Sequence, residues 1–223
     1  MMLSRAETKA LYDKISKVYD LLSEHTEGPV REAGLRMLAP QPGDTVLEIG
    51  FGTGHALVWL APAVGPSGKV HGIDLSDGMF TVAETLIRHE GFTDRVELRT
   101  GDATHLPYPA DSMDAVFMSF TLELFDTPEI PLVLAQCKRV LKTGGRIVVV
   151  GMSKEGKHGV VYEAYEWTHS HFPNFVDCRP ILVSQVIAAA GFQVTEKQNV
   201  QIWVPMEIVR AAKVTELENR PPS

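Results

Sequence analysis

Residues 46–55 read VLEIGFGTGH, and Asp74 follows about 20 residues after the last glycine of this stretch. The first four residues are apolar except for Glu48, which is expected for a strand buried on both faces of a sheet. Glycines tolerate a positive φ angle and carry no Cβ, so the backbone of the following turn can lie directly against a ligand. An acidic residue at the end of the next strand is typical of a βαβ unit that binds the ribose of a nucleoside cofactor.

The spacing of the glycines narrows the class of cofactor. Gly50, Gly52 and Gly54 follow the pattern G-x-G-x-G, and Glu48 precedes them. Dinucleotide-binding proteins use G-x-G-x-x-G instead, which places a pyrophosphate at the N-terminus of the next helix. His55 occupies the position of their third glycine. The spacing therefore disfavours a nicotinamide dehydrogenase.

The composition indicates a single globular domain. The chain has 223 residues, of which 44% are hydrophobic and 22% charged, close to the averages for globular proteins. Its formal net charge of −7 argues against nonspecific binding of nucleic acid through a basic surface. The two cysteines, Cys137 and Cys178, form no CxxC motif, so neither a disulfide framework nor a metal site is predicted. Because no signal peptide and no membrane-spanning apolar run are evident, we expect a cytoplasmic protein.

Short apolar segments alternate with helical segments along the chain. We expect strands at residues 46–49, 70–73, 96–99, 115–119, 146–150, 192–196 and 206–213. One of the helices between them begins after Ser76 as its N-cap, and another ends at Gly144-Gly145. Strands separated by helices indicate a parallel sheet, and two final strands with a short connection indicate an antiparallel edge. The expected fold is α/β, with a Rossmann-like seven-stranded, mostly parallel sheet, an antiparallel edge strand and helices on both faces.

Two further helices are expected before the first strand. Apolar residues recur at helical spacing from about residue 5 to residue 22, and a second helix begins near Pro29 and ends before Pro40. We therefore divide the chain into an N-terminal helical lid, residues 1–42, and a cofactor-binding domain, residues 43–223.

Later segments complete a known pattern. Gly101-Asp102-Ala103 follows the third expected strand, and residues 139–145 lead into the fifth. Together with the glycine-rich turn and Asp74, these segments resemble the class I S-adenosylmethionine-dependent methyltransferases over about residues 43 to 200. The resemblance implies S-adenosylmethionine as the cofactor. It also implies that the glycine turn holds the amino acid and the sulfonium of this cofactor, while Asp74 binds its ribose.

The same resemblance implies contacts with the adenine. Leu75 and Met79 would enclose the ring, Asp102 would accept a hydrogen bond from its amino group, and the Ala103 N–H would donate to the ring. A carboxylate acceptor makes such a hydrogen bond stronger. The alternatives are that Met79 belongs to the helix core and that Asp102 only forms a turn.

Within this class, the chain is similar to the quinone-biosynthesis C-methyltransferases and the related phospholipid N-methyltransferases. The residues that carry this likeness are Tyr12, Val18-Tyr19-Asp20, Arg179-Pro180 and Gly191-Phe192. In that family the leading helix covers the cofactor, so Tyr19 would contact the sulfonium through a cation–π interaction. The alternative is that Tyr19 is a core aromatic. Several charged residues of the quinone enzymes' substrate pocket have no counterpart here, so the acceptor stays open.

The acceptor pocket is expected at the carboxyl edge of the sheet, where ligands bind in open α/β folds. Ser119, which ends the fourth expected strand, would face the reacting methyl group by the same resemblance. The insert at residues 157–175, if helical, places Tyr165 and His169 on one face. His169 is then the predicted general base, and Tyr165 would orient the acceptor. The alternative is that this helix packs its aromatic stripe into the core.

The favoured function is methyl transfer from S-adenosylmethionine to a small-molecule acceptor, such as a quinol, a phenol or another apolar metabolite. A phospholipid headgroup N-methyltransferase and a noncatalytic S-adenosylmethionine-binding regulator are the alternatives. Ser119-Phe120-Thr121 replaces the Asn/Asp-Pro-Pro-aromatic motif of base-modifying methyltransferases, which argues against a nucleic-acid substrate. No transmembrane segment is expected, whereas a peripheral contact with a membrane and a homodimer stay open.

Overall fold

The computed structural model describes residues 27–155, 180–202 and 204–214 of the chain. In these residues a seven-stranded sheet forms the centre of the protein, in the order β3-β2-β1-β4-β5-β7-β6. The strands are β1 (Thr45–Ile49), β2 (Lys69–Asp74), β3 (Val96–Thr100), β4 (Met113–Ser119), β5 (Leu141–Met152), β6 (Gln193–Gln201) and β7 (Pro205–Ala212). The first five strands pair in parallel, whereas β7 is antiparallel to both β5 and β6. The predicted mostly parallel sheet with an antiparallel edge is confirmed.

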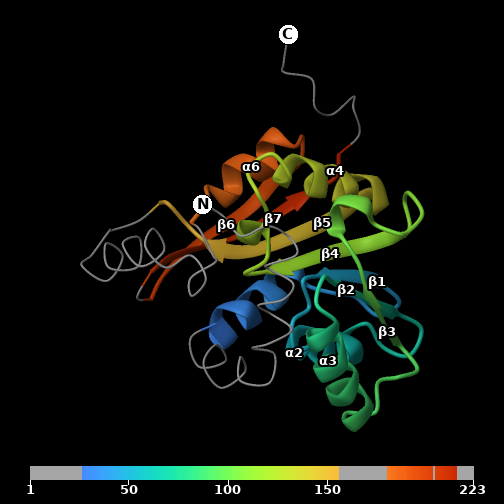
Figure 1. Ribbon diagram of the computed structural model, residues 1–223. Helices are drawn as coiled ribbons and strands as arrows, with labels where there is room; N and C mark the ends of the chain where they lie inside the picture. The colour runs from blue at the N-terminus through green and yellow to red at the C-terminus, as the bar shows by residue number, and fades with distance from the viewer. Residues whose placement is uncertain (1–26, 156–179, 203, 215–223) are drawn as a thin grey trace.

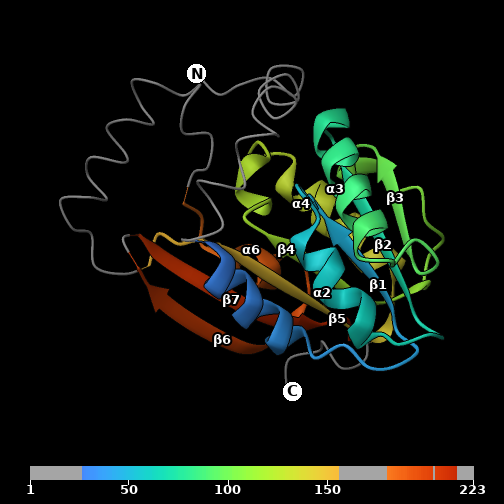
Figure 2. The ribbon, with the colours of Figure 1, turned by 90° about the horizontal axis from the view of Figure 1, so that it is seen from below.

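Helices cover both faces of this sheet (Figure 1). One face carries a helix over residues 27–38, α2 (His55–Ala63) and α3 (Asp77–His89), which lie together when the protein is seen from below (Figure 2). The other face carries α4 (Ile130–Val140) and α6 (Val183–Ala189). Two short 3-10 helices, η1 (Ala103–His105) and η2 (Leu122–Leu124), follow β3 and β4. None of the helices in the described segments is long and apolar enough to cross a membrane.

The central strands are apolar because both of their faces are covered. Val46, Phe117 and Val148 contribute to the apolar cluster on the side of α2 and α3. Leu47 and Val116 point to the opposite cluster, under α4 and α6. All five side chains are fully buried, which explains why these strands read as continuous apolar runs rather than as alternating ones.

The order of the strands determines where a ligand can bind. From β1 the chain proceeds outward to β2 and β3, and then it crosses back to place β4 on the other side of β1. Crossovers on the two sides of this point run in opposite directions, so a crevice opens beyond the carboxyl ends of β1 and β4. The glycine turn after β1 and Ser119 at the end of β4 both lie at this edge.

One predicted boundary was wrong. The helix before Gly144-Gly145 was expected to run to about Leu141, close to the observed end of α4 at Val140. The fifth strand, however, was expected to begin only at Arg146, after the two glycines, whereas β5 already begins at Leu141. The two glycines lie inside β5, beside an irregularity in its pairing with β4. A Cβ on Gly145 would lie only 2.8 Å from the carbonyl oxygen of Lys142, so the bulged strand requires glycine here.

Arg146 of β5 attaches the helix over residues 27–38 to the sheet. Its guanidinium donates to the carbonyl oxygens of Leu38 (2.6 Å) and Ala39 (3.0 Å) and to the carboxylate of Asp44 (2.6 Å). The Arg146 and Asp44 side chains are only 15% and 14% exposed, so little water can replace these bonds. This contact holds the C-terminal end of the helix against the amino edge of the sheet.

We predict that Arg146→Ala lowers the free energy of unfolding by about 2–4 kcal/mol, because it removes a largely buried guanidinium that donates to two carbonyl groups and a carboxylate. Chemical denaturation measures this change. Arg36→Ala is the matched control, since Arg36 forms a solvent-exposed ion pair with Glu32 on the same helix. That change should stay within about 0.5 kcal/mol. Equal losses in the two variants would contradict the anchoring role.

Candidate functional site

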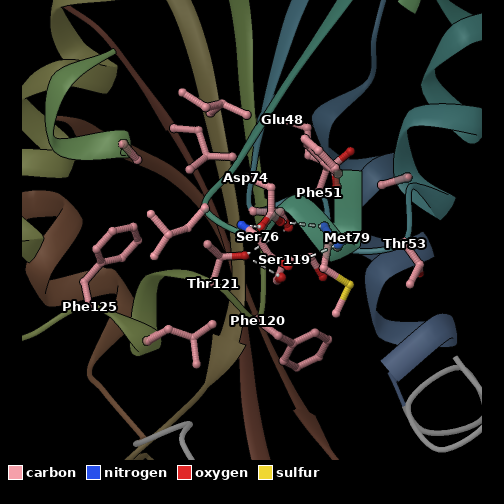
Figure 3. Close-up of a pocket in the computed structure, with 18 of the residues that line it drawn as sticks. Glu48, Phe51, Thr53, Asp74, Ser76, Met79, Ser119, Phe120, Thr121 and Phe125 are labelled. Carbon is pink, nitrogen blue, oxygen red and sulfur yellow. Dashed lines mark hydrogen bonds between the residues drawn. The ribbon is translucent and has the colours of Figure 1, made fainter. Parts of the chain in front are cut away.

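A cavity opens at the carboxyl ends of the central strands (Figure 3). It brings together residues from the turns after β1, β2, β3 and β4, as expected for a crevice at this point of the sheet. Of the predicted site residues, the cavity is lined by Glu48, Gly50, Gly52, Asp74, Leu75, Met79, Asp102, Ala103 and Ser119. Gly54 is not among the lining residues, and Tyr19, Tyr165 and His169 lie outside the described segments. The roles assigned to all these residues remain predictions.

The three glycines of the turn serve three different purposes. All have positive φ angles, at +70° for Gly50, +53° for Gly52 and +94° for Gly54. A Cβ on Gly50 would lie 2.3 Å from the side chain of Thr121, whereas a Cβ on Gly52 would meet nothing within 4 Å. A Cβ on Gly54 would lie 2.9 Å from the Cβ of Ala83 in α3. Gly50 therefore admits Thr121, Gly52 lines the open cavity, and Gly54 lets α3 approach.

Asp74 connects the glycine turn to the start of α3. One carboxylate oxygen accepts the backbone N–H of Gly52 and the other accepts that of Ser76, both at 2.9 Å. The Ser76 hydroxyl in turn accepts the N–H of Met79 at 3.1 Å, which confirms Ser76 as the N-cap. Each carboxylate oxygen has a second lone pair, so these contacts leave Asp74 able to accept the hydroxyls of a ribose.

Asp102 organises the turn after β3. Its Oδ1 accepts the backbone N–H of Thr104 (2.9 Å) and the Thr104 hydroxyl (2.8 Å), and so caps η1. This cap fixes Ala103, whose side chain is buried at the cavity wall. The two predicted roles of Asp102, forming a turn and binding adenine, are thus compatible, because the same carboxylate can cap η1 and face the cavity.

Glu48 is an ionisable group with little compensation for its burial. It is only 2% exposed, and its Oε2 has no hydrogen-bond partner in the described part of the chain. Burial raises the pKa of this carboxyl well above its usual value, while the charge of Arg31 opposes the shift and that of Asp74 adds to it. An unsatisfied carboxyl at a cavity wall is a binding group for a donor or a cation.

The turn after β4 forms the other side of the cavity. Phe120 has a φ angle of +52°, which is unusual for a residue with a side chain, and its N–H donates to the carbonyl oxygen of Val150. The Thr121 hydroxyl donates to the carbonyl oxygen of Ser119 at 2.9 Å. Phe120 and Phe125 lie on the side of the cavity away from Glu48 (Figure 3). With Leu124 they make this end of the cavity apolar.

Sequence reasoning missed several lining residues. Glu27 and Arg31 come from the helix over residues 27–38, and Asp126 and Glu129 come from the segment between η2 and α4. The spacing of four between Glu27 and Arg31 indicates a shared helix face. Only the tertiary placement shows that this face covers the cavity, because no sequence motif marks either residue.

The site fits a nucleoside cofactor that carries an amino acid and a positive charge. Asp74 and Asp102 supply acceptors for hydroxyl and amino groups, Gly52 leaves an open surface, and Glu48 offers an oxygen without a partner. In the described segments no group of three or more His, Cys, Asp or Glu side chains could hold a metal ion. The fold and the site together define a class I methyltransferase architecture.

Comparison with known proteins gives the family. A methyltransferase domain model matches residues 46–145. The demethylmenaquinone methyltransferase of Lactobacillus johnsonii is 32% identical over 74% of this chain and 68% of the relative. That of Symbiobacterium thermophilum is 33% identical over 66% of this chain and 59% of the relative. The structure of a SAM-dependent methyltransferase from Aquifex aeolicus is 27% identical, with a TM-score of 0.67 over 91% of this chain and 98% of the other.

The chain belongs to the S-adenosylmethionine-dependent methyltransferase family, and S-adenosylmethionine is its cofactor. The match to the Symbiobacterium relative spans less than two thirds of that protein's length. The resemblance stated from the motifs is therefore confirmed at the level of the family, the fold and the cofactor.

We predict that Gly50→Ala costs more stability than Gly52→Ala. Both substitutions place an alanine at a positive φ angle, which costs about 1–2 kcal/mol. Only the Cβ on Gly50 also overlaps Thr121, which adds roughly 1–3 kcal/mol of overpacking. Chemical denaturation of the two variants measures the difference. A Gly52→Ala variant as unstable as Gly50→Ala would contradict the contact with Thr121.

We predict that Glu48→Gln gains stability relative to the unaltered protein as the pH rises. Because the folded pKa of Glu48 lies well above 4.5, the folded protein keeps a proton that the unfolded chain has lost. Its free energy of unfolding therefore falls between about pH 4.5 and the raised pKa, by up to about 1.4 kcal/mol per pH unit, and the glutamine variant lacks this loss. Denaturation at several pH values measures the difference. A difference that does not change with pH would refute a protonated Glu48.

Proposed function

We propose that this protein transfers the methyl group of S-adenosylmethionine to a small acceptor of the quinol or phenol class. The observation that supports the proposal is the two-part cavity. One part carries the glycine turn, Asp74 and Asp102, and the other part is walled by Phe120 and Phe125. A polar end for the methyl donor is thus continuous with an apolar end that suits a planar aromatic ring.

The residues for the methyl donor follow from the geometry of the polar end. Asp74 would accept the ribose hydroxyls, and the turn containing Gly52 would lie along the amino acid. Leu75 and Met79 would enclose the adenine, beside Asp102 and Ala103. Hydrogen bonds to backbone N–H groups already hold Asp74 and Asp102 in these positions, so binding of the methyl donor would require little reorganisation.

The amino acid of the donor would meet two charged residues. Glu48 would accept its ammonium group, and Arg31, whose charge acts on Glu48, would receive its carboxylate. Both residues line the cavity on the side of the glycine turn. A bound ammonium group would favour the ionised form of Glu48, so Glu48 and Arg31 would then complement a zwitterion better than a phosphate. This agrees with the departure from the dinucleotide glycine spacing.

Alignment is the main contribution that the protein would make to the reaction. S-adenosylmethionine supplies a methyl group bound to a positively charged sulfur, which is ready for in-line displacement. Ser119 and Phe120 lie between the donor end and the apolar end, so they would hold the acceptor atom in line with that methyl group. Correct alignment of two reactants is worth up to roughly 7–11 kcal/mol in favourable cases.

The names of the relatives support an acceptor of the quinone class. Both curated relatives described above are named as acting on demethylmenaquinone. The apolar wall formed by Phe120, Leu124 and Phe125 is consistent with such a ring. No observation favours the phospholipid headgroup or the noncatalytic alternative.

A screen with radiolabelled S-adenosylmethionine tests the acceptor class. Hydroquinones, simple phenols, thiols and phospholipid vesicles are offered as acceptors under the same conditions. We expect label transfer to the hydroquinones or phenols, and little to the thiols or vesicles. Transfer to phospholipid alone would replace the proposed acceptor by the lipid alternative. Donor turnover with none of the four classes would refute the proposal.

The donor site is checked by calorimetry in the same series. Asp74→Asn should weaken S-adenosylmethionine binding by about 10-fold or more, since one charged acceptor is replaced by an amide. Asp94→Asn is the control, because Asp94 is exposed and pairs with Arg95 away from the cavity. Unchanged affinity in Asp74→Asn would remove Asp74 from the donor site.

A further inference from the structure

Glu123 is a buried carboxyl that the donor site does not use. It belongs to η2, directly after the turn that ends β4, and its side chain is only 1% exposed. Its Oε1 accepts the backbone N–H of Met152 at 3.1 Å, whereas its Oε2 has no hydrogen-bond partner in the described residues. Within residues 27–155, 180–202 and 204–214, neither Lys nor Arg is among the groups that act on it.

The carboxyl of Glu123 lies against the end of β5. A Cβ on Gly151 would lie 3.0 Å from Oε2 and 3.2 Å from Oε1, so the strand leaves room for this group only because residue 151 is glycine. β5 and η2 are thereby held together at the carboxyl edge of the sheet. The structure thus accommodates a carboxyl at a place where an apolar side chain would be more stable.

This position is directly behind the acceptor end of the cavity. Thr121, which precedes η2, and Leu124, its last residue, both line the cavity. Glu27, which lines the cavity from the facing helix, is close enough for its charge to act on the Glu123 carboxyl. Glu123 itself does not line the cavity, but its neighbours along the chain and a charged residue of the facing helix do.

The charged surroundings of Glu123 favour its neutral form. Burial raises its pKa to about 7, with Glu27 adding to the shift and the N–H groups of Met152 and of Glu123 itself opposing it. On the side of β7, Glu207 pairs in register with Gly151, and Lys197 of β6 lies 3.5 Å from Glu207. A carboxyl with such a pKa can both take up and release a proton near neutral pH.

We propose that Glu123 is the group that takes up the proton which a hydroxyl-bearing acceptor loses during methyl transfer. The proposal rests on the proposed function, because the hydroxyl of a quinol or phenol acceptor has to lose its proton in the reaction. The unpartnered Oε2 would receive the proton through a side-chain rotation toward the cavity or through one bridging water. A proton acceptor must lie within hydrogen-bond reach or one water of the proton.

The proposed step consists of a proton transfer followed by a methyl transfer. The O–H bond of the acceptor breaks, its electron pair stays on the acceptor, and the proton moves to the Glu123 carboxylate. The electron-rich acceptor then forms a bond to the methyl carbon while the methyl–sulfur bond breaks, and sulfur keeps that pair as a neutral thioether. One proton is released per methyl group transferred, and Glu123 passes it to solvent.

The test compares Glu123→Gln with the unaltered protein on a hydroquinone or phenol acceptor. Glutamine keeps an oxygen for the Met152 N–H but cannot take up a proton. We expect kcat to fall by about 10²–10⁴-fold. We also expect the rise of kcat with pH near pH 7 to disappear, while calorimetry finds an unchanged affinity for S-adenosylmethionine. A variant that keeps this rise would overturn the proposal.

A more acidic acceptor distinguishes proton uptake from a structural role. 2,4-Dinitrophenol is already ionised at neutral pH, so it needs no base, and the two proteins should methylate it at similar rates. A structural role would lower the rates with both acceptors equally, and that result would refute the assignment. Glu207→Gln is the matched control. Glu207 is a fully buried glutamate on the same side of the sheet, but Ser153 and the Ser184 N–H already occupy its oxygens, so its substitution should leave the pH profile unchanged.

Two further outcomes separate this inference from the proposed function. If Glu123→Gln does not fold, the unaltered protein still decides the question. Its kcat should rise near pH 7 with the phenol and stay level with 2,4-dinitrophenol, and a level profile with both acceptors would overturn the role of Glu123 alone. If no hydroxyl-bearing compound is methylated by the unaltered protein, the proposed function fails and the proposal for Glu123 fails with it.

Discussion

The site depends on the carboxylate of Asp74, which holds two backbone N–H groups that are distant in the sequence. One belongs to Gly52 in the turn after β1, and the other belongs to Ser76 at the start of α3. Without this carboxylate, the N–H groups of Gly52 and Ser76 would lose the acceptor that fixes their orientation at the cavity. The residue that is expected to bind the ribose is therefore also the residue that shapes the turn around it. Binding and folding share one group here.

Several acidic side chains differ in their partners between the two edges of the sheet. At the amino edge, Asp114 accepts the Lys142 ammonium at 2.7 Å and the N–H of Thr45 at 2.9 Å, and Asp44 pairs with Arg146. These pairs join neighbouring strands and serve stability. At the carboxyl edge, Glu48 and Glu123 are buried with one oxygen each left without a partner in the described residues.

This contrast separates structural from functional acids. A buried carboxyl without a cation costs free energy, and a protein that needed only stability would replace it with an apolar residue. In the described residues, Glu48 of β1 and Glu123 of η2 each have an oxygen without a hydrogen-bond partner, and both lie where β1, β4 and β5 end. In the proposed function they would stand at the donor end and behind the acceptor end of one cavity. Perturbed carboxyls of this kind cluster at reactive sites.

The sequence predicted the parts of the fold that local chemistry controls. Continuous apolar runs marked the buried strands, and the serine before α3 marked its N-cap, because both signals come from neighbouring residues. Gly144-Gly145 misled the reading because a pair of glycines is equally compatible with a helix end and with a bulged strand. Pairing with β4, which is a tertiary contact, selects the bulge.

The candidate site was predictable where a motif carried it and not elsewhere. The glycine turn, Asp74 and Asp102 follow strands directly, so their meeting at one edge of the sheet follows from the topology. Arg31 reaches the cavity only through the packing of its helix. Glu123 was overlooked because a glutamate in a short helix usually lies on the surface. Its importance depends on Gly151, which comes from another strand.

A base on the sheet edge also has a physical advantage over one on the insert. The sequence suggested His169, from the segment at residues 157–175, as the base. Glu123 is instead part of η2, which follows β4, and its carboxyl accepts the N–H of Met152 in β5. Its backbone would therefore keep its place when the acceptor enters, and only its side chain would rotate or bind one bridging water. Since a misplacement of about 1 Å can cost 10²-fold in rate, a proton acceptor built on rigid strands suits a reaction that depends on alignment.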